Sequence, residues 1–286
     1  MKIKKDLTTR QVSALFDVNE STVRRWAMSG RIKCSVSAGG HRKFSHEDIV
    51  SFAIGKGIQI NSTQYSESNR KSVITKIVNL TFQNNVKSIE LILIDLYLNG
   101  VQLSDLMDNY LEPVLIRIQK RLDAEKISIA QEHLARKVVS QSINNLRNSV
   151  ISKDRHNGKN ILCLNLENDI PDIPIDMIDM LLQSVGYSVD NCGSNTSIKN
   201  LTKLLLKNRY DAIFVYLCDR QCCSATVHKF IDKTNRDLSE IKKLAKKYNI
   251  ALFLGGPSFK NISECTLKGF NLFSKYSDCL NISKLL

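Results

Sequence analysis

The stretch Leu7–Ala53, LTTRQVSALFDVNESTVRRWAMSGRIKCSVSAGGHRKFSHEDIVSFA, decides how the rest of this 286-residue chain is interpreted. Val12, Leu15 and Phe16 follow the spacing i, i+3, i+4, which places three apolar side chains on one face of a helix that begins near Thr8–Thr9. The stretch therefore opens with a short amphipathic helix.

A second short helix follows the first after a tight turn. Val23 and Trp26 repeat the apolar spacing, Asn19 or Ser21 can cap the start, and Gly30 ends the helix. An aromatic residue at helical spacing packs in the hydrophobic core more often than it contacts a binding partner, so we assign Trp26 to the core. The opposite face carries hydroxyl and guanidinium groups. Such groups can bond phosphates and base edges in a major groove. They belong to Ser21, Thr22, Arg24 and Arg25.

The segment after this helix predicts a β-hairpin. Apolar and polar residues alternate over 32–36 and a second strand runs through Lys43 and Phe44, with Gly39 and Gly40 allowing the reversal between them. We expect His41, Arg42 and Lys43 at its tip. Ser45 and Asp48 then have the spacing of a capping box that starts a third helix.

These segments resemble the winged helix-turn-helix of the MerR regulators. The resemblance lies in Thr22-Val23-Arg24-Arg25-Trp26, similar to the family's recognition helix, and in Gly39-Gly40-His41-Arg42-Lys43-Phe44, similar to its wing. It implies that the segment binds double-stranded DNA. The residues expected to contact DNA are Arg10, Ser21, Thr22, Arg24, Arg25, His41, Arg42 and Lys43.

Length, charge and cysteine content agree with a cytoplasmic protein of two or three domains. The net charge is +13, and residues 1–60 contribute eleven Lys or Arg against five Asp or Glu, so a polyanionic partner is favoured. No apolar run reaches the ~18 residues of a membrane span, so no membrane partner is expected. The eight cysteines lack paired metal-ligand spacing and are expected to be small buried residues; a redox or metal role for the cluster Cys218, Cys222 and Cys223 is the weaker alternative.

Composition divides the chain into four parts. Residues 1–56 form the DNA-binding segment, and residues 57–70, rich in Gly, Ser, Thr, Asn and Gln, form a connector. Residues 71–156 contain four apolar-periodic segments joined by short connections, which predicts a four-helix bundle. The third of these segments contains Pro113 and the fourth runs from about Ser128 to Val150.

From residue 157 to 286 the period changes to alternating strands and helices. Short apolar runs at 160–166, 187–192, 211–217 and 250–256 predict strands, with a fifth near 271–273. Helical stretches at 174–185, 197–207 and 239–247 lie between them. The alternation predicts a five-stranded doubly wound parallel sheet, whose ligands would lie beyond the carboxyl ends of the strands.

A bundle followed by such a sheet resembles the cobalamin-binding module of methionine synthase and of cobalamin-dependent light-sensing MerR repressors. The text LNGVQLSDLMDNYLEPVLIRIQKRLDAEKISIAQEHLARK, which includes Glu132-His133, is similar to the family's cap helices, and Gly255-Gly256 matches its glycine pair. The pair Glu132-His133 could touch a ligand or a metal, but helix capping and interhelical hydrogen bonds are the favoured roles.

Four positions depart from that family's cofactor motifs. Asp169 remains, but Pro171 and Pro174 stand where the resemblance places the cobalt-ligating histidine and the glycine that clears the nucleotide tail. Proline supplies no lone pair to a metal. Tyr216 replaces a small hydroxyl residue, and Leu122 replaces the tryptophan above the corrin. We therefore expect no cofactor, in particular no cobalamin, and DNA binding that is indifferent to light.

The sequence thus predicts a transcriptional regulator and not an enzyme. It should form a homo-oligomer, and its C-terminal module should respond to oligomerisation, to another small ligand or to a protein partner. A functional cobalamin-dependent, light-responsive repressor is the first alternative. A corrinoid methyl carrier is the second, and it would require the histidine that Pro171 replaces.

Overall fold

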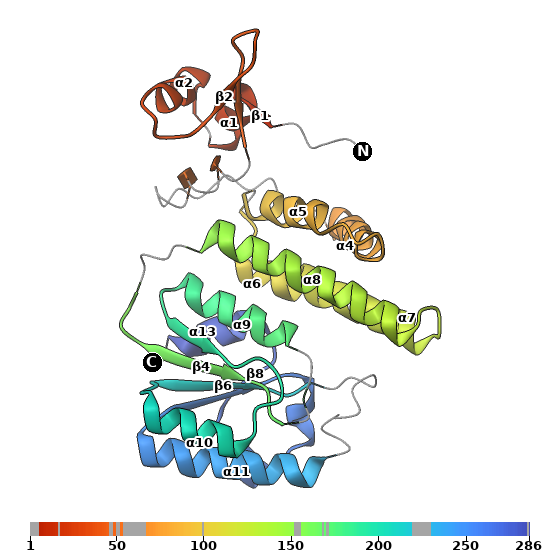
Figure 1. Cartoon of the computed structure of the whole chain (residues 1–286), viewed down its shortest axis with the longest axis vertical. Helices are drawn as coiled ribbons and strands as arrows, with labels where there is room; N and C mark the ends of the chain where they lie inside the picture. Colours follow the sequence, from red (N-terminus) through yellow and green to blue (C-terminus); the bar gives the residue numbers. More distant parts are fainter. Residues whose placement is uncertain are drawn as a thin grey trace. The chain divides into compact units, whose positions relative to one another are not determined.

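The computed structural model describes residues 6–16, 18–45, 48–49, 52–53, 67–98, 100–151, 156–167, 169, 172–218, 230–284 and 286 (Figure 1). The chain divides into two compact units. One comprises Met1–Val114 and Lys137–Ser152, and the other comprises Leu115–Arg136 and Lys153–Leu286.

The first part of the chain is a small helix-turn-helix with a three-stranded sheet. Its elements are β1 (Leu7–Thr8), α1 (Thr9–Leu15), α2 (Glu20–Met28), β2 (Ser35–Val36) and β3 (Arg42–Phe44). The antiparallel sheet has the order β1-β3-β2, so the predicted hairpin is present as β2 and β3. Strand β1 was not predicted, because two residues show no alternation and their pairing with Lys43 and Phe44 is a tertiary contact.

Three aromatic rings hold the two helices together. The ring of Trp26 lies 5.8 Å from that of Phe16 and 4.7 Å from that of Phe52, centroid to centroid. Val12 and Val23 are fully buried beside them. Trp26 thus packs against the apolar side of the domain as predicted, although its side chain stays half-buried. Covering this side of α2 leaves the opposite side for solvent.

The middle of the chain is helical. It contains α4 (Glu67–Phe82), α5 (Val86–Leu98), α6 (Leu103–Leu106), a π-helical turn η1 (Met107–Leu111), α7 (Glu112–Asp123) and α8 (Ile129–Val150). Helix α4 begins inside the predicted connector, so residues 67–70 are helical. The predicted third helix is the continuous run from α6 to α7. Its π-helical turn lies just before Pro113, which has no N–H to donate and whose ring would clash with the carbonyl of Asn109 in a regular helix.

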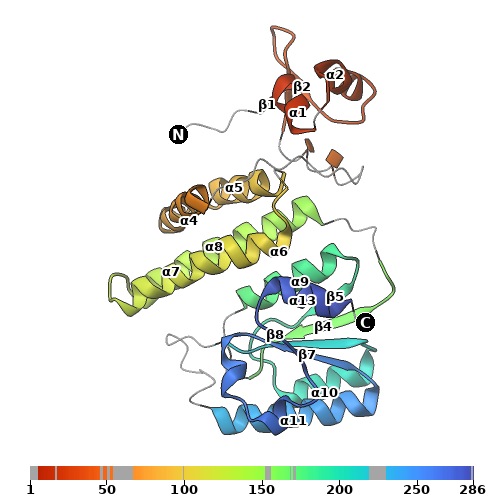
Figure 2. The same cartoon turned by 180° about the vertical axis from the view of Figure 1, so that it is seen from behind.

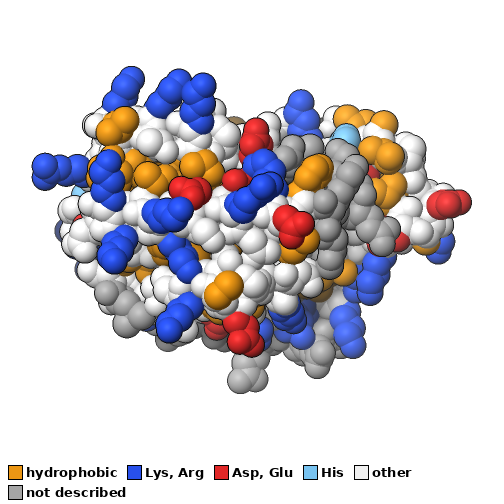
Figure 3. Space-filling view, turned by 90° about the horizontal axis from the view of Figure 1, so that it is seen from below, with side chains coloured by type: hydrophobic (Ala, Val, Ile, Leu, Met, Phe, Trp, Pro, Cys, Tyr) orange, Lys and Arg blue, Asp and Glu red, His pale blue; other side chains and the backbone are white. Residues whose placement is uncertain are grey.

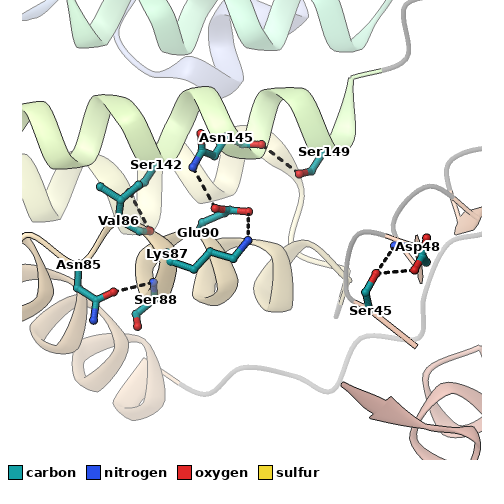
Figure 4. A network of polar contacts seen from close by, with 10 residues as sticks. All are labelled: Ser45, Asp48, Asn85, Val86, Lys87, Ser88, Glu90, Ser142, Asn145 and Ser149. Atoms are coloured by element: carbon teal, nitrogen blue, oxygen red, sulfur yellow. Dashed lines mark hydrogen bonds and ion pairs between the residues drawn. The ribbon is translucent and has the colours of Figure 1, made fainter. Parts of the chain in front are cut away.

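A buried carboxylate joins α5 to the C-terminal half of α8 (Figure 4). Glu90 is 4 % exposed and accepts hydrogen bonds from Lys87 Nζ and Asn145 Nδ2, each at 3.0 Å. Ser142 Oγ donates to the Val86 carbonyl oxygen at 3.4 Å. The bonds from Lys87 and Asn145 partner the Glu90 carboxylate, whose negative charge would be costly to bury without partners.

The C-terminal part is a five-stranded, fully parallel sheet. Its order is β5-β4-β6-β7-β8, the arrangement predicted for a doubly wound fold (Figures 1 and 2). The strands are β4 (Asn160–Leu164), β5 (Ser188–Asn191), β6 (Ala212–Tyr216), β7 (Ala251–Gly255) and β8 (Asn271–Phe273). The central strand β6 is buried throughout, as its continuous apolar run predicts.

Helices cover the two faces of this sheet. Helices α9 (Ile173–Ser184) and α13 (Tyr276–Ser283) contact each other on one face, and α10 (Ile198–Lys207) and α11 (Ile231–Tyr248) contact each other on the opposite face (Figure 2). A 3₁₀ turn, η2 (Pro257–Asn261), and the short α12 (Glu264–Leu267) follow β7. Helix α11 begins at Ile231, earlier than the predicted start at Ser239, because the polar residues in its first turns do not show an apolar stripe.

No helix in the described ranges is both long enough and apolar enough to span a bilayer.

Candidate DNA-binding and ligand-binding sites

Helix α2 presents a polar face opposite its aromatic core. Ser21, Arg24 and Arg25 are exposed and Thr22 is half-buried, while Val23 between them is fully buried. The chain turns away after Met28 because Gly30 adopts φ +68°, a conformation that favours glycine. Arg10 is exposed on α1. The predicted hydroxyls and guanidiniums of α2 therefore lie on one accessible helix face.

The two arginines of this face differ in their partners. Arg24 Nη2 lies 3.2 Å from Glu20 Oε2, one helical turn earlier, and both side chains are about half exposed. No carboxylate of a described residue forms an ion pair with Arg25. The pairing of Glu20 with Arg24 was not predicted, although their i, i+4 spacing was the available signal. A ligand of Arg24 would compete with the Glu20 carboxylate, whereas Arg25 has no such ion pair within the described chain.

The hairpin places its basic residues differently from the prediction. Arg42 and Lys43 are paired with Val36 and Ser35 inside the ladder, so they do not lie at the tip. The turn is closed by Ser37, whose N–H donates to the His41 carbonyl at 2.9 Å and whose Oγ accepts from the His41 N–H at 3.2 Å. His41 lies in the turn, outside both strands. The prediction failed for Arg42 and Lys43 because the two-strand ladder extends closer to the turn than alternation alone reveals.

The start of the next helix has one of the two hydrogen bonds of the predicted capping box. Asp48 donates its N–H to Ser45 Oγ at 3.1 Å, and the Ser45 hydroxyl donates to Asp48 Oδ2 at 2.6 Å (Figure 4). The carboxylate thus accepts from the hydroxyl rather than from the backbone of Ser45. This cap fixes the chain directly after β3.

At the carboxyl edge of the parallel sheet lies a buried carboxylate. Asp169, 4 % exposed, accepts the Cys218 N–H at 2.9 Å through Oδ2, and its Oδ1 has no hydrogen-bond partner among the described residues. Burial raises the pKa of Asp169 from 3.8 to about 7, opposed by the hydrogen bond from Cys218. Ser258 Oγ, also buried, is likewise without a partner there, and its N–H donates to the neighbouring Leu217 carbonyl at 3.4 Å. Two unsatisfied oxygens therefore flank Leu217–Cys218.

The remaining positions of the predicted pocket pack closely against the chain itself. A Cβ on Gly255 would lie 2.1 Å from the Phe273 ring, and one on Gly256, at φ +99°, would lie 2.3 Å from the Leu217 carbonyl oxygen. Both glycines are thus required by packing at this edge. Tyr216 is buried at the end of β6, and Pro174 is buried in the first turn of α9, where proline is tolerated. Pro171 lies outside the described residues.

The pair Glu132-His133 is split between core and solvent. Glu132 is fully buried and accepts from Arg136 Nε one turn later, while Arg136 Nη2 donates to Gln119 Oε1 on α7 at 3.3 Å. His133 is 66 % exposed, with Nε2 3.8 Å from Glu132 Oε2. The interhelical bond expected of this pair is thus made by Arg136, whose i, i+4 spacing from Glu132 was the missed signal. Leu122 is half-buried on α7.

The cysteines are less uniformly buried than expected. Cys163, Cys218 and Cys279 are buried, but Cys192 and Cys265 are exposed. Cys222 and Cys223 lie outside the described residues. Within the described parts of the chain, no three His, Cys, Asp or Glu side chains gather closely enough to hold a metal ion.

A pocket of about 320 Å³ opens at the opposite, amino edge of the sheet. Its lining includes Lys207, Arg209, Ser188 and Asp190. The Asp190 carboxylate is already engaged, because it accepts from the Tyr210 hydroxyl at 2.5 Å. Burial, with this bond, raises the pKa of Tyr210. The charged side chains of Lys207, at the end of α10, and of Arg209 are therefore accessible to solvent at this pocket.

Comparison with protein families assigns the N-terminal part. Residues 7–56 match the family described as helix-turn-helix domain. The chain thus carries an N-terminal helix-turn-helix domain. No curated protein sequence matches the chain.

Comparison with solved structures assigns the fold of the rest. The monomethylamine corrinoid protein of Methanosarcina barkeri is similar with a TM-score of 0.56 and 12% identity, over 76% of this chain and 99% of that one. A cobalamin-binding protein of Desulfitobacterium hafniense gives 0.36 and 11%, over 74% and 97%. The methanol:cobalamin methyltransferase complex of M. barkeri gives 0.37 and 13%, over 94% and 92%. The helices and the parallel sheet have the fold of a corrinoid protein.

This result contradicts one expectation. The motif departures at residues 122, 171, 174 and 216 led us to expect no cobalamin, yet the chain has the fold of a structure described as a corrinoid protein, with a TM-score of 0.56. Individual motif residues can change while the fold that forms the pocket persists. The prediction that no cofactor is bound is therefore withdrawn.

Proposed function

We propose that the protein is a DNA-binding transcriptional regulator of the MerR type whose C-terminal module senses a ligand. The observation that carries this proposal is the division of helix α2. Its aromatic side is locked between Phe16 and Phe52, and its opposite side exposes Ser21, Arg24 and Arg25. A rigidly seated helix with exposed arginines is the element that enters a major groove in helix-turn-helix proteins.

The chemistry of α2 suits base recognition. Arginine can donate two parallel hydrogen bonds to guanine, and one such contact is worth ~1 to 3 kcal/mol of discrimination. Arg42 and Lys43 on β3 and the exposed Arg10 supply further positive charge for phosphates. DNA binding should therefore combine a sequence-specific part from α2 with a salt-sensitive part from the other cations.

A selection experiment tests this function. The full-length protein is mixed with a pool of random DNA duplexes, bound duplexes are amplified over several rounds, and affinity is measured for the enriched and for a scrambled sequence. We expect an enriched motif bound about a thousandfold or more tighter than the scrambled duplex. Equal affinity for the two duplexes would contradict the proposal.

Self-association is part of the same proposal. One domain of about 50 residues contacts little DNA, and operators read by such helices usually contain two half-sites. The enriched motif should therefore be an inverted repeat. Light scattering of the full chain with and without this duplex should give a mass above that of the monomer, and a strictly monomeric complex on a single half-site would refute it.

We place the ligand site at the carboxyl edge of the sheet, with a corrinoid as the first class to test. The unsatisfied Asp169 Oδ1 and Ser258 Oγ can bind polar groups of a ligand there. A corrinoid supplies a large planar ring with amide side chains and a cobalt centre. Proline at position 171 offers no nitrogen to cobalt, so the protein's contribution would be hydrogen bonding and packing rather than axial ligation.

Reconstitution tests this assignment. The purified full chain is incubated in the dark with adenosylcobalamin or methylcobalamin, desalted, and examined by visible absorption before and after illumination. A retained corrin spectrum, reduced in Asp169→Asn and Ser258→Ala, is the expected result. A spectrum retained equally by both variants would place the corrinoid elsewhere, and no retained spectrum would exclude this ligand class.

The fold similarity favours one other function, that of a corrinoid carrier serving a methyltransferase. The helix-turn-helix domain at residues 7–56 favours the regulator, because carrying a methyl group to an enzyme does not require such a domain. We propose that the protein is not itself an enzyme. Retention of a corrinoid without any effect on DNA affinity would favour the carrier.

A further inference from the structure

The two helical layers of the C-terminal sheet differ in charge. On one face α10 has three lysines and no acidic residue, and α11 has six Lys or Arg and three acidic residues. On the other face α9 has two aspartates and α13 one, and neither helix has a Lys or Arg. Solubility alone does not require that the basic residues gather on one sheet face.

The basic residues of α10 and α11 form two parallel stripes directed away from the sheet. Lys199, Lys203 and Lys207 lie four residues apart on α10, and all three are exposed. Leu201 and Leu205, which are buried against the sheet, lie on the opposite side of this helix. With a rise of ~1.5 Å per residue the stripe is about 12 Å long.

Helix α11 repeats this arrangement next to α10. Arg236, Lys243 and Lys247 are exposed, whereas Leu238, Ile241 and Ala245 are buried. Because α10 and α11 contact each other on one sheet face, their outward stripes lie side by side. Figure 3 shows many Lys and Arg side chains spread over the molecule from this side, with Asp and Glu side chains interspersed among them. We call these six residues the basic face.

Most of this charge is not neutralised within the described chain. Lys243 pairs with Glu240 at 2.7 Å, and Lys233, beside the stripe, pairs with Glu167 and Asp237. The lysines of α10 and Arg236 form no ion pair with any described carboxylate. Arg209 and Lys207 continue the charge into the pocket at the amino edge of the sheet.

We propose that the basic face binds the DNA backbone as a second contact, outside the groove contacted by α2. The proposal rests on the proposed DNA-binding function and on charge complementarity. The lysines are compact point charges on long stems, which suit phosphates and not base edges. Among the described residues of α10 and α11, Leu206 is the one large apolar side chain exposed enough to insert into a bilayer, so DNA is favoured over an anionic membrane.

Neutralising the stripe of α10 tests the proposal. In the full-length variant Lys199→Gln/Lys203→Gln/Lys207→Gln the helix is retained, because Lys and Gln have similar helix propensities. Each phosphate that the variant no longer neutralises should lower the slope of log K against log salt by ~0.9. We expect the magnitude of the slope to fall by about 2 to 3, and affinity for long duplexes at low salt to fall about tenfold, while the preferred sequence is unchanged.

A control variant with the same charge change separates a local contact from net charge. Lys71→Gln/Lys76→Gln/Lys120→Gln alters three exposed helical lysines on α4 and α7, and it should keep the wild-type slope. Equal slopes in the α10 variant and the wild type would overturn the proposal, as would an equal fall in slope in both variants. If the wild-type protein binds no DNA, both the proposed function and this inference fail. If the wild-type protein binds DNA and the α10 substitutions leave the slope unchanged, this inference alone fails.

The alternative partner is tested with vesicles. Co-sedimentation with phosphatidylcholine vesicles containing phosphatidylserine should give weak binding that the α10 substitutions change no more than the control substitutions do. Vesicle binding abolished in the α10 variant, together with unchanged DNA binding, would assign the basic face to a membrane and overturn the proposal.

Discussion

Asp169 is the residue whose environment differs most from the expectation for its type. The family resemblance marked it as a retained motif residue, but only the structure reveals that one of its oxygens accepts from Cys218 and that the other is unsatisfied among the described residues. With a pKa of about 7 instead of 3.8, the folded protein holds a proton on this carboxyl over the pH range in which the unfolded chain does not. The stability contributed by this proton is present at low pH and is lost as pH rises from about 4 to about 7.

Asp169→Asn should remove this pH dependence. Each pH unit of pKa shift corresponds to ~1.4 kcal/mol, so the free energy of unfolding of the wild type should fall between pH 5 and pH 8 by about 2 to 4 kcal/mol more than that of the variant. Urea unfolding followed by circular dichroism at both pH values measures the difference. An identical pH dependence in the two proteins would show that the carboxyl is ionised normally.

Two exposed cysteines should differ in reactivity. Hydrogen bonding to Ser263 and Thr266 lowers the pKa of Cys265, whereas desolvation and the nearby Asp190 raise the pKa of Cys192. Because the thiolate is the nucleophile, iodoacetamide at pH 7.5 should alkylate Cys265 faster than Cys192. Peptide mass mapping over time gives both rates, and Ser263→Ala should slow Cys265 only. Faster labelling of Cys192 would contradict this.

At the scale of elements, periodicity predicted what local sequence determines. The strands β4, β6 and β7 are continuous apolar runs, and they were predicted within one or two residues at each end. The π-helical turn η1 and strand β1 could not be predicted, because the first results from Pro113 within a longer helix and the second from pairing with β3. The site residues on α2 followed from periodicity, but the ion pair of Arg24 with Glu20 required the structure.

The link between α5 and α8 provides a test at this scale. Glu90→Ala removes the carboxylate that accepts from Asn145 Nδ2 and Lys87 Nζ, two exposed side chains that can bond water instead. Because a hydrogen bond contributes ~0.5 to 1.5 kcal/mol net, the thermal midpoint of helix unfolding should fall measurably. Circular dichroism at 222 nm compares this variant with Lys76→Ala, an exposed substitution on α4. Equal midpoints would show that the link contributes nothing.

The molecule as a whole combines a helix-turn-helix domain with the fold of a corrinoid protein. Composition and motif spacing were enough to predict both parts, since the first depends on a short local pattern and the second on alternating strands and helices. The cofactor prediction was wrong because it treated four substituted positions as equivalent to losing the pocket. The basic face was also missed, because the residues that form it come from two helices brought together only by the parallel sheet.

The central claim is that α2 reads DNA sequence. Its most direct test is the affinity of Arg24→Ala/Arg25→Ala for the selected duplex and for a scrambled one, measured at one salt concentration. We expect binding to the selected duplex to weaken tenfold or more, since each arginine–guanine pair is worth ~1 to 3 kcal/mol, and the preference over the scrambled duplex to shrink in proportion. The control Lys71→Ala/Lys76→Ala, which removes the same charge, should keep the preference. An unchanged preference in the arginine variant would contradict the account.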